Sequence, residues 1–115
     1  MKESEINIKV HLDDEKIPQQ IIWTATGSTA ESPQNAKAMF IAFWDALDKS
    51  ALRIDLWTKD MMVDEMEDFF YQTLMTMADT YQRATRHDDL AAEMKNFARN
   101  IYQKSRAKQL IENKL

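Results

Sequence analysis

The residues with most chemical potential lie together in the segment 52–70, LRIDLWTKDMMVDEMEDFF, which holds four Asp, two Glu, a Lys and a Trp. Among them, Glu67 and Asp68 follow Asp64 by three and four residues, so the three acids share one face of a helix. Carboxylates so placed suit Mg²⁺ or Ca²⁺. A cation site usually takes ligands from more than one element, however. We therefore favour a solvated acidic helix face and predict no metal site.

Other catalytic chemistry finds little support in this chain. His11 and His87 are the only histidines, there is no cysteine, and Gly27 is the only glycine. A histidine could act as a base beside an aspartate, but no Gly-x-Ser-x-Gly elbow and no glycine-rich phosphate loop is present. We predict that the protein is not an enzyme, with no catalytic residue and no cofactor.

Length and composition indicate a single globular domain spanning residues 1–115. Hydrophobic residues make up 44% of the chain and the net charge is −4. An acidic chain whose aromatic residues are not interleaved with Lys and Arg is a poor candidate for nucleic-acid binding. No segment reads as a secretory signal or a membrane span, so we expect a cytoplasmic protein. Residues 83–115 carry eight Lys or Arg and four acids. This basic end favours an acidic surface of the chain or a partner, with an anionic membrane as the alternative.

The first half of the chain alternates apolar and polar residues, which is typical of half-buried strands. We expect strands over 5–12 and 21–25, a loop over 26–36, and strands over 37–47 and 52–57. The period then changes to that of amphipathic helices, expected at about 61–84, with Asp60 as N-cap, and at 88–110. Strands before helices predict an α+β fold, with a four-stranded antiparallel sheet over 4–58 followed by two C-terminal helices.

The third expected strand is apolar on both of its faces. Within KAMFIAFWDAL, one face holds Phe40, Ala42 and Trp44, and the other holds Met39, Ile41 and Phe43. Two terminal helices cover only one face of an antiparallel sheet. We therefore expect homo-oligomerisation through the sheet, with coverage by the 26–36 loop as the alternative.

Several strings in the chain carry a family resemblance: SEINIKVHLDDEKIP, IIWTA, LRIDLWTKDM, VDEM, QTL and MADTY. Together they resemble the gliding-motility protein GldC family of Bacteroidetes, over nearly the whole chain. The resemblance implies a cytoplasmic accessory protein of gliding motility, with protein partners in that machinery and no catalytic residue. Part of the shared string could mark a partner surface.

Two functions follow as hypotheses. The first is a noncatalytic protein-binding module, with Arg53, Asp55 and Trp57 on the outward face of their strand and Met39, Ile41 and Phe43 as partner-binding residues. The second is a chaperone-like oligomer that binds unfolded or exported segments. The element order is similar to that of the bacterial export chaperone SecB, an analogy of topology alone.

Overall fold

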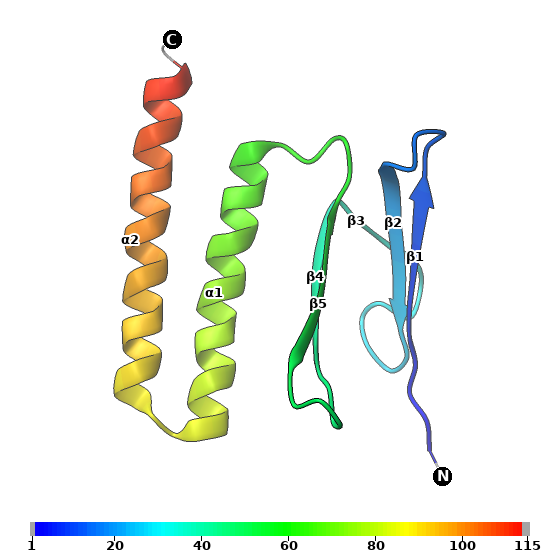
Figure 1. Cartoon of the computed structure of the whole chain (residues 1–115), viewed down its shortest axis with the longest axis horizontal. Coiled ribbons are helices and arrows are strands. Elements are labelled where there is room, and N and C mark those ends of the chain that lie inside the picture. Colours follow the sequence, from blue (N-terminus) through cyan, green and yellow to red (C-terminus); the bar gives the residue numbers. More distant parts are fainter. Residues whose placement is uncertain (1, 114–115) are drawn as a thin grey trace. The chain divides into compact units, whose positions relative to one another are not determined.

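A computed structural model describes residues 2–113 of the chain. Its strands are all antiparallel and precede two helices, which confirms the α+β fold with a C-terminal helix pair (Figure 1). The chain forms two compact units, divided between Met61 and Met62. The strands build the first unit and the helices build the second. A single domain over the whole chain stays a prediction.

The first sheet has three strands in the order β1-β2-β3: β1 (Ile6–Leu12), β2 (Pro18–Ala25) and β3 (Gln34–Ala36). The turn between β1 and β2 is held by Asp13, whose Oδ1 accepts the backbone N–H groups of Glu15 and Ile17 at 2.8 and 2.9 Å. An aspartate that caps its own turn in this way fixes the register of a hairpin. Ile21 of β2 is buried, with 1% of its surface exposed.

The second sheet has two strands, β4 (Ala38–Trp44) and β5 (Ala51–Trp57). The structure thus has five strands in two sheets, where one sheet of four strands was expected. The difference arises at residues 34–36, which were assigned to a loop because of Gly27 and Pro33. They pair with β2, and only Lys37 separates them from β4. The expected third strand is therefore real but is preceded by a short strand that belongs to the other sheet.

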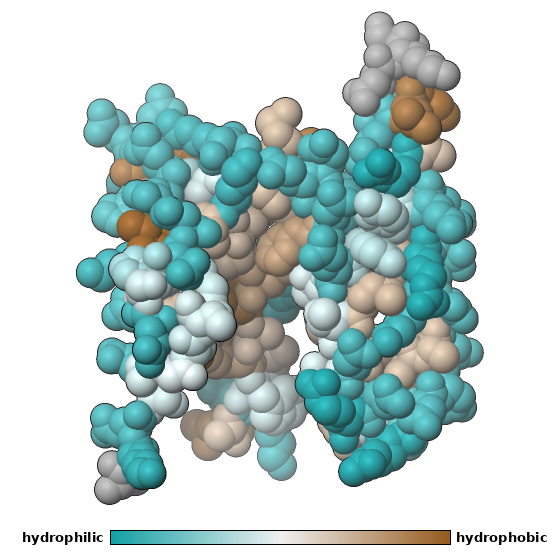
Figure 2. All heavy atoms as spheres, turned by 180° about the vertical axis from the view of Figure 1, so that it is seen from behind, coloured by the Kyte–Doolittle hydropathy of each residue, from teal (hydrophilic) through white to brown (hydrophobic). Residues whose placement is uncertain are grey.

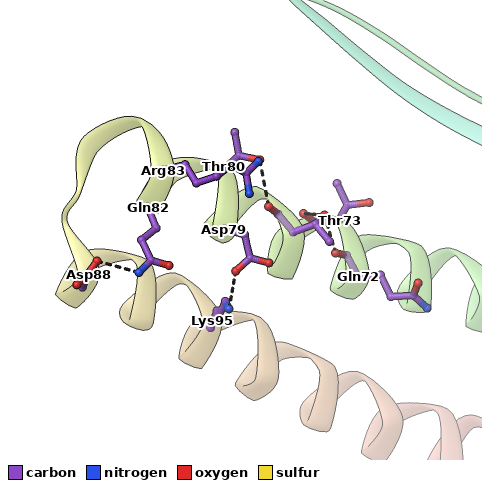
Figure 3. Close-up of polar contacts among 9 residues, drawn as sticks. Gln72, Thr73, Asp79, Thr80, Gln82, Arg83, Asp88 and Lys95 are labelled. Carbon is purple, nitrogen blue, oxygen red and sulfur yellow. Dashed lines mark hydrogen bonds and ion pairs between the residues drawn. The ribbon is translucent and has the colours of Figure 1, made fainter. Parts of the chain in front are cut away.

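The second unit is a helical hairpin of α1 (Val63–Thr85) and α2 (Asp88–Asn113). The buried residues of this hairpin are alanines, whose small side chains allow the helices to pack closely: Ala78, Ala91 and Ala98. Figure 3 shows the two polar links near the turn: Lys95 Nζ lies 2.6 Å from Asp79 Oδ1, and Gln82 Nε2 donates to Asp88 Oδ1 at 2.8 Å. No helix in the described part of the chain is long and apolar enough to cross a membrane.

The start of α1 differs from the expectation. Met62 is the N-cap, and its backbone N–H donates to Glu65 Oε1 at 3.1 Å. Asp60 was expected in that position, but its carboxylate accepts a hydrogen bond from the Thr58 hydroxyl at 2.7 Å. The acidic residues that follow still lie where the helix dipole favours negative charge.

Candidate protein-interaction surface

Strand register defines two faces of the β4–β5 hairpin. Residues directly opposite each other in an antiparallel pair point to the same side of the sheet. Met39, Ile41 and Phe43 of β4 lie opposite Leu56, Ile54 and Leu52 of β5. These six residues are the apolar face. Phe43, Leu52 and Ile54 are between 50% and 62% exposed. Figure 2 shows hydrophobic residues gathered over this part of the chain.

The opposite side of the hairpin is the mixed face: Ala38, Phe40, Ala42 and Trp44 of β4, with Ala51, Arg53, Asp55 and Trp57 of β5. Arg53 Nη2 lies 2.8 Å from Asp55 Oδ1, and its guanidinium carbon is 6.0 Å from the centre of the Phe40 ring. The two charges on this face therefore neutralise each other. Trp44 and Trp57 are 70% and 56% exposed.

The structure does not bring the six predicted partner-binding residues onto one surface. Arg53, Asp55 and Trp57 lie on the mixed face, while Met39, Ile41 and Phe43 lie on the apolar face. A flat partner can contact only one of these sets. The hairpin itself presents large apolar side chains on both of its faces. A two-stranded hairpin is marginally stable unless something packs against it.

Sequence reasoning missed the junction that follows β5. Thr58 is 2% exposed, its backbone N–H donates to the Lys37 carbonyl at 2.7 Å, and its hydroxyl lies 2.9 Å from the same oxygen. Lys59 forms an ion pair with Asp13 Oδ2 in the β1–β2 turn. The only signal in the sequence is a threonine at the end of an alternating strand, which any strand end tolerates. Junction contacts of this kind depend on tertiary structure.

The carboxyl groups at the junction are held in their charged form. The hydrogen bond from Lys59, and then that from the Ile17 backbone, lowers the pKa of Asp13 from its ordinary value of 3.8. The Thr58 hydroxyl bond is the main cause that lowers the pKa of Asp60. Both groups are therefore fixed carboxylates near neutral pH, unsuited to act as general acids.

An open cleft of 880 Å³ lies beside this junction. It is lined by His11, Leu12, Gln19, Gln20, Asn35, Ala36, Lys37, Thr58 and Asp60. Gln20 Nε2 donates to Asn35 Oδ1 at 3.1 Å, which links these two amides across the cleft lining. His11 and Asp60 share the cleft, but no hydrogen bond joins them within residues 2–113. Thr58 is only 2% exposed, so its hydroxyl is poorly placed to attack a substrate.

Asp64, Glu67 and Asp68 of α1, the acids considered above as metal ligands, each have different neighbours. Asp64 Oδ1 accepts the Glu65 backbone N–H at 2.8 Å, and Asp68 Oδ1 accepts the Tyr102 hydroxyl at 2.6 Å. Glu67 lines a groove between the helices. In the part of the chain that is described, no three His, Cys, Asp or Glu side chains are grouped to hold a metal ion.

The other histidine also has a local role. His87 lies just after α1, with its ring centre 6.3 Å from that of Tyr81 in an edge-on arrangement. Such a contact stabilises the turn between the helices. His11 belongs to the first unit and His87 to the second.

These features define a class: a small α+β protein with a helical hairpin and a β-hairpin that presents exposed apolar residues on both faces. A family model described as "Gliding motility-associated protein GldC-like" matches residues 18–107. The chain belongs to the GldC-like family. No curated protein and no solved structure matches it.

Proposed function

We propose that the chain is a noncatalytic accessory protein of gliding motility that acts in the cytoplasm by binding protein partners. Family membership supports the link to motility. One observation carries the binding role: large apolar side chains of β4 and β5 remain exposed on both faces of the hairpin. Exposed apolar patches on small proteins are typical of interaction surfaces.

Trp57 is the first residue to test. It is 56% exposed, and the residue opposite it in the register is only an alanine, Ala38. Tryptophan is enriched among interface residues whose removal costs most affinity. We expect Trp57→Ala to weaken partner binding about 30-fold while the melting temperature stays near that of the wild type.

The binding experiment compares three variants as bait in pull-downs from gliding cells. Trp57→Ala alters the mixed face and Phe43→Ala alters the apolar face. Leu47→Ala is the matched control, because Leu47 is 89% exposed but lies in the turn between β4 and β5, outside both faces. Loss of a partner in one face variant and not in the control identifies the binding face. Full retention of partners by both face variants contradicts the proposal.

The noncatalytic role has its own test. His11 is the cleft residue best suited to proton transfer. Complementation of a deletion strain with His11→Ala should restore gliding, whereas Trp57→Ala should not. A gliding defect from His11→Ala in a protein of unchanged stability and partner binding would contradict a purely binding role.

A chaperone-like homo-oligomer is the second candidate function. Trp44 and Trp57 are exposed on one face and Phe43 on the other. This favours an oligomer, because further copies of the chain would cover both faces. Light scattering on a size-exclusion column tests assembly, and suppression of client aggregation tests the chaperone activity. A monomer of 13.5 kDa that leaves an unfolded client to aggregate would exclude this candidate.

A further inference from the structure

The helical hairpin contains an apolar groove of 200 Å³ that no function discussed above uses. It is lined by Glu67, Phe70, Tyr71 and Leu74 of α1 and by Ala98, Ile101, Tyr102 and Ser105 of α2. The Tyr71 and Tyr102 ring centres are 4.4 Å apart. Phe70 and Ile101 are 50% and 45% exposed, so the groove is open to solvent. Its volume suits one large side chain and not a whole helix.

Glu67 gives this apolar groove a charged end. Its Oε2 atom is buried and has no hydrogen-bond partner among the residues described. The neighbouring acid, Asp68, accepts the Tyr102 hydroxyl, and Arg106 Nη1 lies 3.4 Å from that same hydroxyl. The nearby cation is therefore directed at the tyrosine. A buried acceptor without a donor is costly and calls for a specific explanation.

We propose that this groove binds an arginine or lysine side chain of a partner protein, with the cation on Glu67 and the apolar stem between the helices. A groove with apolar and aromatic walls and a carboxylate among its lining residues fits a ligand with an apolar body and a cationic donor at its end. Of the two helices that line the groove, α1 favours a cationic ligand by its charge, whereas α2 carries five Lys or Arg and four acids. The α1 helix carries five acids (Asp64, Glu65, Glu67, Asp68 and Asp79) against one base, Arg83.

This inference does not rest on the β4–β5 surface, because all residues of the groove belong to the second unit. The sequence carried a partial signal for it. Glu67 precedes Phe70, Tyr71 and Leu74 by three, four and seven residues, which puts an acid on the apolar stripe of its helix. Reading it together with Asp64 and Asp68 as one solvated acidic face obscured this position.

The test uses phenethylguanidinium as probe, added to the full chain and followed by nitrogen–proton correlation NMR. Phenethylurea has nearly the same shape but no charge. We expect the guanidinium to shift the amide signals of Leu74, Ala98 and Tyr102, and the urea to bind about tenfold more weakly. Glu67→Gln should weaken guanidinium binding by a similar factor. Glu93→Gln, on the exposed surface of α2, is the matched control and should leave binding unchanged.

A second measurement separates binding from folding. Since the Glu67 oxygen has no partner to lose, Glu67→Gln should melt at the same temperature as the wild type or higher. Equal binding of guanidinium and urea, unchanged binding by Glu67→Gln, or shifts mapped outside the groove would each overturn the proposal. A solution mass that rises with concentration in wild type but not in Glu67→Gln would also overturn it, because the occupant would then be a second copy of the chain.

Discussion

Replacement of Thr58 by valine isolates one hydroxyl at the junction after β5. Thr58 is 2% exposed and its hydroxyl lies 2.9 Å from the Lys37 carbonyl and 2.7 Å from Asp60 Oδ1. One hydroxyl proton serves only one of these acceptors at a time. Valine keeps the shape of threonine, so the change removes the hydrogen bond without opening a cavity.

The size of the effect follows from what happens to the two acceptors. The Lys37 carbonyl keeps the Thr58 backbone N–H at 2.7 Å, and the exposed residue Asp60 can accept hydrogen bonds from water. Neither acceptor is stranded, so the cost should be that of one ordinary net hydrogen bond, about 1 kcal/mol. Thr58→Ala also removes a buried methyl group and should cost about 2 kcal/mol.

Urea unfolding followed by two signals measures this cost. All three tryptophans, Trp23, Trp44 and Trp57, lie in the first unit, so fluorescence reports on the sheets. Far-ultraviolet circular dichroism reports mainly on the helices. With a urea slope of about 1.5 kcal/mol per molar, Thr58→Val should lower the fluorescence midpoint by about 0.7 M. No shift, or a cost of about 3 kcal/mol, would refute the view that the hydroxyl makes one replaceable hydrogen bond.

Three further predictions concern other contacts. Ala78→Leu should destabilise the helical hairpin by about 1–3 kcal/mol through overpacking, and circular dichroism should show no such loss for the exposed control Ala84→Leu. Asp13→Asn removes a carboxylate of lowered pKa, which stabilises the folded protein above pH 3.8 and ceases to do so as the pH falls through the lowered pKa. The melting temperatures of wild type and Asp13→Asn should therefore converge in acid, and a difference that is the same at every pH would contradict this. Asp68→Asn should lower the pKa of Tyr102, which the hydrogen bond to Asp68 raises above 10.0; an unchanged tyrosinate absorbance titration would argue against that bond.

The parts of the fold that follow from local periodicity were predictable. The change from alternating residues to three- and four-residue steps lies near residue 60, and the structure places the last strand and first helix on either side of it. The break between the helices at Arg86 also agrees, since Arg86 is the C-cap with a positive φ of 65°. Strand β3 was missed because its three residues, Gln34–Ala36, follow a glycine and a proline and are too few to show a periodic signal. Its pairing with β2 is a tertiary choice.

The candidate site also combines features that the sequence predicts with features that only tertiary structure provides, as the string LRIDLWTKDM illustrates. Thr58 and Lys59 have partners in distant segments, Lys37 and Asp13. Asp60 pairs with Thr58, and Arg53 pairs with Asp55, each only two residues away. All five residues therefore have structural explanations, but only those of Thr58 and Lys59 come from pairing between distant segments, which sequence spacing alone does not contain. Trp57 differs from them, because it remains 56% exposed opposite an alanine. Folding therefore accounts for most of this string, and the tryptophan is the residue whose presence a binding function must explain.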